Sequence, residues 1–292
     1  MISAFLFLVA CTPDSKDSRP PGGHQGDDTG RADTADSAND SGDSGDSGDT
    51  DTGGGGDSAD TSDTGRDTGG ETGALLDPPL NGTSGGSGGV EAPTGTTLST
   101  GGTTYQLLAP RGTSTARAVP LLLVYSGTEG SSVMTSNMRQ VQSYAHLSDA
   151  LIAVLDGQRD NAADGEAVLD DLRMLYDIDN DRTWLLSESA GTTAGLDLGF
   201  HERQSMFAAY WVNDVNARDT PEATAAELGF APWGNVGPGG DDPDANAIVA
   251  AMRSAGYQLP EDAPYSGSGS DTHGSTDQFL AAVSFFSDKS RE

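Results

Sequence analysis

The chain has 292 residues, 45 of them acidic and 15 basic, which gives a formal net charge of −30. This acidity excludes binding to nucleic acid or to anionic lipid headgroups by charge attraction. The single cysteine, Cys11, excludes a disulfide within the chain.

The N-terminal sequence is typical of a targeting segment. Residues 2–10 form an apolar run that is too short to span a bilayer and resembles the core of a secretory signal. Leu8-Val9-Ala10-Cys11 resembles the bacterial lipobox, which implies cleavage before Cys11 and lipidation of its thiol. We predict a lipoprotein signal peptide over residues 1–11; plain secretion and an unmodified thiol remain the alternatives. Thr12, rather than Asp, favours the outer membrane of a bacterial cell envelope.

Residues 12–95 consist almost entirely of Asp, Ser, Thr, Gly and Pro, and the triplet Ser-Gly-Asp repeats three times over residues 41–49. The segment has too little apolar surface to offset the entropy lost on ordering, so we predict a disordered linker. Its carboxylates lack the defined turn and bidentate Glu of a calcium loop, so no bound calcium is expected.

Residues 96–292 are rich in apolar side chains and predict one folded domain. Strand-like and helix-like segments alternate, and the strand-like ones are nearly unbroken apolar runs. This pattern is typical of a mostly parallel central sheet flanked by helices, an α/β fold. The expected strands are 105–109, 119–125, 150–155, 183–186 and 205–212, and the expected helices are 134–147, 165–176, 192–200, 245–256 and 278–286.

Ser187-Glu188-Ser189-Ala190-Gly191 lies between an apolar strand and a helix-like segment. A serine at such a tight turn needs small residues two positions before and after it, here Ser187 and Gly191. We predict that Ser189 is a nucleophile and that the N–H of Ala190 is one donor to the oxyanion. The alternative is an ordinary helix start with a serine cap.

The order of the elements resembles the α/β-hydrolase fold, and within it the polyhydroxybutyrate depolymerase and feruloyl esterase-like group. The resemblance covers about residues 103–288 and rests on four segments: 126–130, 176–182, 187–191 and 204–209. It implies a serine esterase that needs no metal or organic cofactor. It also implies a second oxyanion donor from Gly127 or Thr128, although Ser126 stands where relatives usually have histidine.

The same resemblance implies a histidine base in the loop before the last helix, where this chain has His273. The acid follows the serine and precedes the histidine in chain order. Asp242, in a glycine-rich turn before a helix, is the first candidate. The alternatives left open are Asp241, Asp244 and Asp214. The remaining histidines, His24, His146 and His201, are expected to have no catalytic role.

Two other patterns have weaker functional interpretations. Asp177, Asp179 and Asp181 have the spacing of a calcium loop, but Arg182 stands where that loop needs glycine. Trp233 is a candidate lining of a substrate groove, whereas the other tryptophans lie on expected strands.

The sequence therefore predicts a serine hydrolase outside the cytoplasm that cleaves carboxylic esters, of polyester or feruloyl type, through an acyl-enzyme on Ser189. It is expected to be a monomer held at the membrane by Cys11. A hydrolase-fold surface module without activity and a peptidase on the same fold remain the alternatives.

Overall fold

The computed structural model describes residues 78–87, 95–110, 117–142, 147–237 and 243–292. The predicted signal peptide with Cys11, and the linker up to residue 77, lie outside this part of the chain. Among the described residues, none of the helices has the length and apolar character that a bilayer crossing requires.

The core is a seven-stranded sheet in the order β1-β2-β4-β3-β5-β6-β7. Strands β4, β3, β5, β6 and β7 are parallel, and β1 and β2 join as an antiparallel edge. The prediction of a mostly parallel sheet is confirmed. The strands are β1 (Thr96–Thr100), β2 (Thr103–Leu108), β3 (Val119–Tyr125), β4 (Leu151–Leu155), β5 (Ile178–Glu188), β6 (Ala209–Asn213) and β7 (Trp233–Val236).

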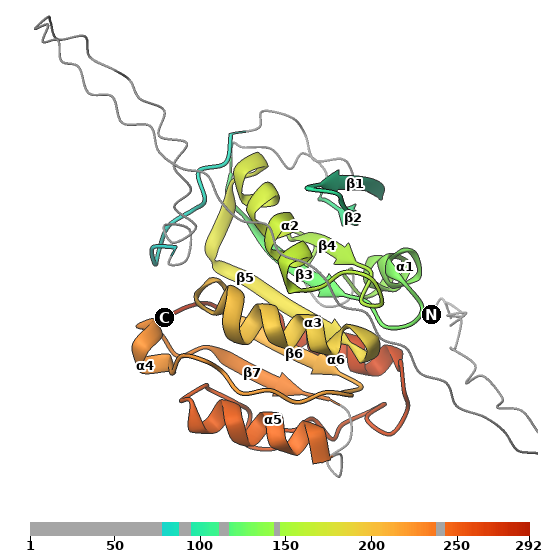
Figure 1. The fold of residues 1–292 in the computed structure, drawn as a ribbon, viewed down its shortest axis with the longest axis vertical. Coiled ribbons are helices and arrows are strands. Elements are labelled where there is room, and N and C mark those ends of the chain that lie inside the picture. The colour runs from blue at the N-terminus through green and yellow to red at the C-terminus, as the bar shows by residue number, and fades with distance from the viewer. Residues whose placement is uncertain (1–77, 88–94, 111–116, 143–146, 238–242) are drawn as a thin grey trace, which may run out of the picture. The chain divides into compact units, whose positions relative to one another are not determined.

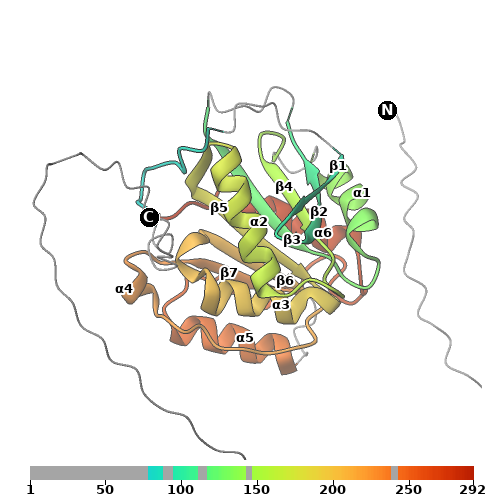
Figure 2. The same ribbon diagram turned by 45° about the horizontal axis from the view of Figure 1, so that its top comes forward.

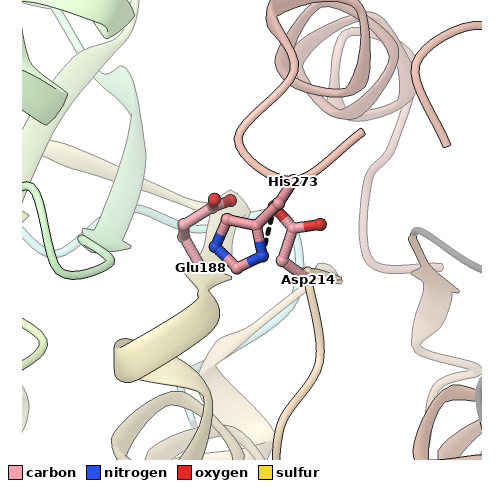
Figure 3. Close-up of side chains that lie close together, drawn as sticks. All are labelled: Glu188, Asp214 and His273. Atoms are coloured by element: carbon pink, nitrogen blue, oxygen red, sulfur yellow. Dashed lines mark ion pairs between the residues drawn. The ribbon is translucent and has the colours of Figure 1, made fainter. Parts of the chain in front are cut away.

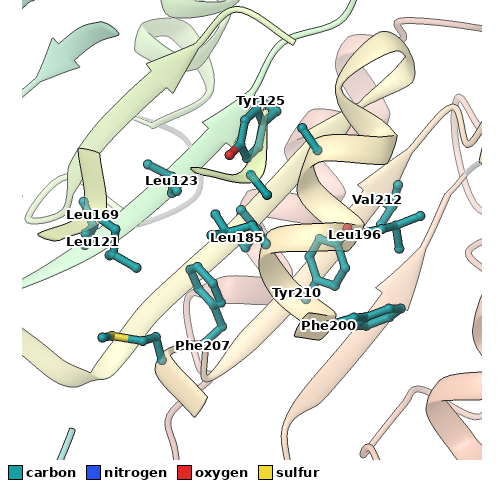
Figure 4. Packing of buried hydrophobic residues seen from close by; sticks show 14 of the residues in the cluster. Leu121, Leu123, Tyr125, Leu169, Leu185, Leu196, Phe200, Phe207, Tyr210 and Val212 are labelled. Atoms are coloured by element: carbon teal, nitrogen blue, oxygen red, sulfur yellow. The ribbon is translucent and has the colours of Figure 1, made fainter. Parts of the chain in front are cut away.

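Helices cover both faces of the sheet (Figures 1 and 2). One buried cluster contains apolar residues of α2, α3 and α5, and a second contains those of α1 and α6. Figure 4 shows part of the first cluster, in which Leu121 and Leu123 of β3 lie near Leu169 of α2. The helices are α1 (Ser131–Gln142), α2 (Ala162–Leu175), α3 (Thr192–Asp197), α4 (Ala225–Leu228), α5 (Pro243–Ser254) and α6 (Thr276–Phe286).

The central strands are apolar throughout because both of their faces are covered. Every residue of β3 and of β4 is buried. A strand with one solvated face would instead alternate apolar and polar residues. The continuous apolar runs thus follow from the position of these strands between two helical layers.

Some elements differ from expectation. Strand β5 (Ile178–Glu188) is longer than the predicted strand 183–186, and the other differences concern short or polar elements. Residues 205–212 were predicted to be one strand, but β6 starts only at Ala209, after a 3-10 turn at Gln204–Met206. Strand β1 is a run of Thr, Leu and Ser on the sheet edge, and β7 is only Trp-Gly-Asn-Val. Neither offers the apolar run or the alternation that marks a strand in sequence.

Residues 78–87 lie against the folded domain, although the sequence places them in the linker. Thr83 forms an antiparallel bridge with Asp179, and the Ser84 N–H donates to the Ile178 carbonyl at 2.8 Å. The carbonyl of Pro78 accepts a hydrogen bond of 2.6 Å from the Arg291 guanidinium. Backbone groups of this segment form hydrogen bonds with β5 and with the C-terminal region. The packed domain therefore includes residues ahead of the predicted boundary at 96.

Candidate active site

Ser189 stands at a sharp turn between the carboxyl end of β5 and α3. Its φ is +44°, in the left-handed region that residues other than glycine rarely adopt, and it is 8% exposed. A Cβ at Gly191 would lie 2.7 Å from the Tyr125 Cβ and 2.8 Å from the Ser126 carbonyl oxygen. Glycine at 191 therefore lets the turn pack directly on β3.

Ser187 occupies the position two residues before Ser189, where glycine is usual, and the helix opposite makes room for it. A Cβ at Gly195 would lie 2.5 Å from the Ser187 Cβ. The Ser187 hydroxyl lies 3.3 Å from the Tyr210 hydroxyl, so its polar atom has a partner although it is buried. The larger side chain is thus accommodated by a glycine on α3.

His273 and Asp214 meet beside this turn (Figure 3). The His273 Nδ1 lies 3.8 Å from Asp214 Oδ2, and the two side chains are 60% and 2% exposed. Asp214 directly follows β6 with a φ of +49°, and its Oδ2 accepts a 2.5 Å hydrogen bond from the Gly274 N–H. Among the described residues, no hydrogen bond joins the Ser189 hydroxyl to the His273 imidazole, so the site lacks a complete hydrogen-bonded triad.

Gln278 holds the histidine loop, and the sequence reasoning missed it. Its side-chain amide lies fully buried in α6 and donates to the carbonyls of Gly269 and Thr272, both at 2.7 Å. It also lies 3.5 Å from Asp214 Oδ1. The available signal was a glutamine on the apolar face of an otherwise hydrophobic helix, since a buried amide needs a specific partner.

Glu188, the residue before Ser189, points into the same cluster (Figure 3). It is 2% exposed, and its Oε2 has no hydrogen-bond partner among the described residues. Burial, and then the neighbouring charge of Asp214, raise the pKa of Glu188 well above its usual value. One ligand atom each from Glu188, Asp214 and His273 lies within 4.8 Å of the others, so these three residues are the described group that could hold a metal ion.

Gly127 lies next to Ser189, as expected of an oxyanion donor. A Cβ at Gly127 would lie 3.4 Å from the Ser189 Cβ. Its N–H, however, donates to Glu129 Oε1 at 3.1 Å, while Thr128 is exposed and Ala190 is half-buried. Burial raises the pKa of Glu129, although hydrogen bonds from backbone N–H groups oppose this shift. The predicted donor is thus present but occupied by a carboxylate of the protein.

Of the four candidates for the acid, the structure describes Asp244 and Asp214. Asp242 and Asp241 lie outside the described residues, so the prediction for Asp242 stays a prediction. Asp244 forms an ion pair with Arg218 at 2.6 Å. Asp214 is the candidate that the structure brings to His273.

The other histidine of the described chain has different partners. His201 Nε2 lies 2.9 Å from Asp219 Oδ2, and its Nδ1 lies 3.5 Å from Glu222 Oε2. His24 and His146 lie outside the described residues.

The two weaker sequence patterns have structural explanations. The three aspartates with calcium-loop spacing bind protein groups: Asp177 accepts from the Gly85 N–H, Asp179 pairs with Arg182, and Asp181 pairs with Arg291. The groove prediction for Trp233 is wrong. Trp233 starts β7, at the amino end of the parallel strands, with Lys289 Nζ 4.7 Å from its ring centroid. Ser189 follows the opposite, carboxyl end of β5.

No family model and no curated protein matches this chain. Among solved structures, a thermostable esterase has 19% identity and a TM-score of 0.50, covering 67% of this chain. The chain spans 62% of that esterase's length. An esterase from Pyrobaculum calidifontis has 11% identity and a TM-score of 0.45, covering 65% and 84% of the two chains. An S-formylglutathione hydrolase from Staphylococcus aureus has 13% identity and a TM-score of 0.46, covering 66% and 97%. The likeness to the thermostable esterase, together with the sheet order, shows that the chain has the α/β-hydrolase fold.

Proposed function

We propose that the protein is a serine hydrolase that cleaves carboxylic esters. The observation that supports this proposal is that three chain segments converge at the carboxyl ends of the parallel strands. Ser189 is held in a left-handed turn at the end of β5, and the His273–Asp214 pair lies beside the preceding residue, Glu188. Nucleophile, base and orienting acid are the groups that acyl transfer requires.

In the proposed reaction, the Ser189 hydroxyl attacks the ester carbonyl and passes its proton to His273. Because Nδ1 faces Asp214, Nε2 is the nitrogen that accepts this proton. The Asp214 carboxylate then stabilises the imidazolium. His273 gives the proton to the departing alcohol, which leaves an acyl-enzyme on Ser189. Water, deprotonated by the same imidazole, releases the acid and restores the serine.

The N–H groups of Ala190 and Gly127 are the proposed oxyanion donors. For Gly127 to serve, the Glu129 carboxylate must leave its N–H. This occupied donor is the feature that favours the alternative, a surface module without activity. Turnover of any ester by the wild-type chain rules that alternative out.

The cellular setting is proposed from the sequence alone. We place the protein at the bacterial cell envelope, attached through lipidated Cys11, with a bulky ester of the polyester or feruloyl type as substrate. In a bacterial host, Cys11→Ser is expected to move the protein from the membrane fraction to the soluble fraction. Equal membrane retention of the variant and the wild type would contradict lipid attachment through Cys11.

The test of the function is hydrolysis of a p-nitrophenyl ester by matched variants. Ser189→Ala and His273→Ala are expected to remove hydrolysis. Asp214→Asn is expected to lower kcat by about 10³- to 10⁴-fold, because the imidazole loses its orienting carboxylate. Asp242→Asn serves as the matched control and should stay near wild type. Loss of activity in Asp242→Asn with retention in Asp214→Asn would reverse the assignment of the acid.

A further inference from the structure

We propose that Glu188, Asp214 and His273 form a binding site for Zn²⁺ and that the bound ion blocks hydrolysis. Zinc binding goes beyond the proposed function and is independent of it. The inhibition rests on the proposed function, because the ion and the reaction would share two residues.

The geometry brings one ligand atom from each of three separate chain segments to one place. Glu188 ends β5, Asp214 follows β6, and His273 precedes α6. The three atoms lie within 4.8 Å of one another, and the His273 Nδ1 is 3.8 Å from Asp214 Oδ2. Ligands bound to zinc at about 2.0–2.2 Å are roughly 3–4 Å apart, so small side-chain rotations would close the set. His273, at 60% exposure, is free to make them.

The burial of Glu188 is a second, independent indication of a metal site. Glu188 is 2% exposed, and its Oε2 has no hydrogen-bond partner among the residues that the structure describes. A buried carboxyl oxygen without a partner is unfavourable, and Figure 3 shows this side chain directed toward the imidazole. A cation between the three groups would give the orphan oxygen a partner.

Hydrogen bonds already orient the Asp214 carboxylate, as is usual for carboxylates that bind a metal. Asp214 Oδ2 accepts from the Gly274 N–H at 2.5 Å, and its Oδ1 lies 3.5 Å from the Gln278 amide. These two groups fix the Asp214 side chain without using all of its lone pairs.

The donor set selects the class of ion. One imidazole nitrogen and two carboxylate oxygens suit zinc better than Mg²⁺ or Ca²⁺, which prefer oxygen ligands alone. Three protein ligands also leave the fourth position of tetrahedral zinc open. An imidazole bound to the ion is held away from its role as base, so the zinc-loaded protein would be inactive.

A second histidine supplies a matched control. His201 also lies between two carboxylates, but Asp219 approaches its Nε2 and Glu222 approaches its Nδ1. The two carboxylates therefore lie on opposite sides of the ring and cannot converge on one ion with it. His201→Gln should leave zinc binding unchanged.

The test is calorimetric titration of the full chain with ZnCl₂ after removal of metal by chelation. The wild type, His201→Gln and Ser189→Ala are expected to bind one ion at the high-affinity site. His273→Ala and Glu188→Gln are each expected to weaken that site by at least about tenfold. His273→Ala is the primary variant, because its exposed side chain is lost without emptying the core.

Comparison within the full chain removes the contribution of weak binding to the acidic tail, which all variants share. A wild-type affinity no higher than that of His273→Ala would overturn the site. Unchanged affinity in Glu188→Gln, with circular dichroism of a folded protein, would overturn its three-ligand composition.

The inhibition is read separately from binding. Hydrolysis of a p-nitrophenyl ester is expected to fall over the same zinc concentrations that fill the site, and Mg²⁺ should have no effect. Undiminished hydrolysis with the site filled would overturn the inhibition. Zinc binding without any ester hydrolysis would refute the proposed function but support the zinc site. Hydrolysis without zinc binding would support the proposed function and refute the zinc site.

Discussion

Glu129 is the residue whose position most directly opposes the proposed chemistry. Its carboxylate accepts the Gly127 N–H at 3.1 Å, where the developing oxyanion would need that donor. A negative charge there also disfavours the oxyanion electrostatically. We expect Glu129→Ala to raise kcat for a p-nitrophenyl ester by up to about tenfold, because breaking a hydrogen bond to a charged group costs on the order of 1.5 kcal/mol.

Glu261→Ala, which removes an exposed carboxylate, serves as the control for the change in net charge. A fall in kcat for Glu129→Ala alone would show that Glu129 assists the reaction instead of obstructing it.

His201 gives a pH dependence of stability at the residue scale. Partial burial disfavours its charged form, but the hydrogen bond and charge of Asp219, helped by Glu222, outweigh burial and raise the pKa of His201. The folded state therefore binds the proton more tightly than the unfolded chain, whose histidine pKa is about 6.5. The resulting stabilisation is complete below that value and is lost as the pH rises through the raised folded pKa.

Urea unfolding of the wild type and His201→Gln should show this dependence. The difference in their free energies of unfolding is expected to be larger at about pH 6 than at about pH 9. It should stay below about 1 kcal/mol, because the pair is partly exposed. A larger difference at the higher pH would contradict the assigned sign.

At the scale of elements, the contact between α3 and β5 determines whether the turn at Ser189 can form. Ser187 fits because Gly195 has no side chain. Gly195→Ala is expected to lower the free energy of unfolding by about 1–3 kcal/mol through overpacking. Adding Ser187→Gly should recover most of this loss, since it restores glycine to one side of the contact. Urea unfolding measures both, and strictly additive effects would show that the two positions do not compete for space.

The elements that could be predicted from sequence are those whose environment is uniform. Strand β3 was predicted at the bounds that the structure gives, because an unbroken apolar run indicates burial on both faces. Helix α6 was predicted to within two residues at its start. Strand β1 was missed because its Thr-rich sequence lies on a partly exposed edge, where pairing with β2 decides the conformation.

The candidate site was predictable only in part, for a related reason. The turn at Ser189 can be recognised from the local sequence, because it requires small residues two positions before and after the serine. The proposed acid, Asp214, has no such local signature, since 45 acidic residues are scattered over the chain. What distinguishes Asp214 is its contact with the loop of His273, where the Gly274 N–H donates to its Oδ2. This contact joins segments that lie far apart in the chain, so it cannot be derived from spacing.

At the scale of the whole molecule, Arg291 connects segments far apart in sequence. Its side chain is 2% exposed, donates to the carbonyls of Pro78 and Ser205 at 2.6 and 2.8 Å, and pairs with Asp181 at 3.3 Å. Arg291→Ala is expected to lower the free energy of unfolding by about 3 kcal/mol or more, because Asp181 and two carbonyls lose a buried partner.

Arg159→Ala is the matched control, since the Arg159 side chain is 83% exposed and its ion pair lies at the surface. Its effect on urea unfolding should be close to zero. Equal stability of the two variants would show that the Arg291 contacts contribute little to the fold.

The proposed reaction is tested most directly by covalent labelling of the full chain with a fluorophosphonate, followed by peptide mass spectrometry. A single adduct on Ser189 is expected, at a rate that falls sharply in His273→Ala. No adduct on the wild type, or equal labelling of Ser189→Ala, would contradict a nucleophilic serine at this turn.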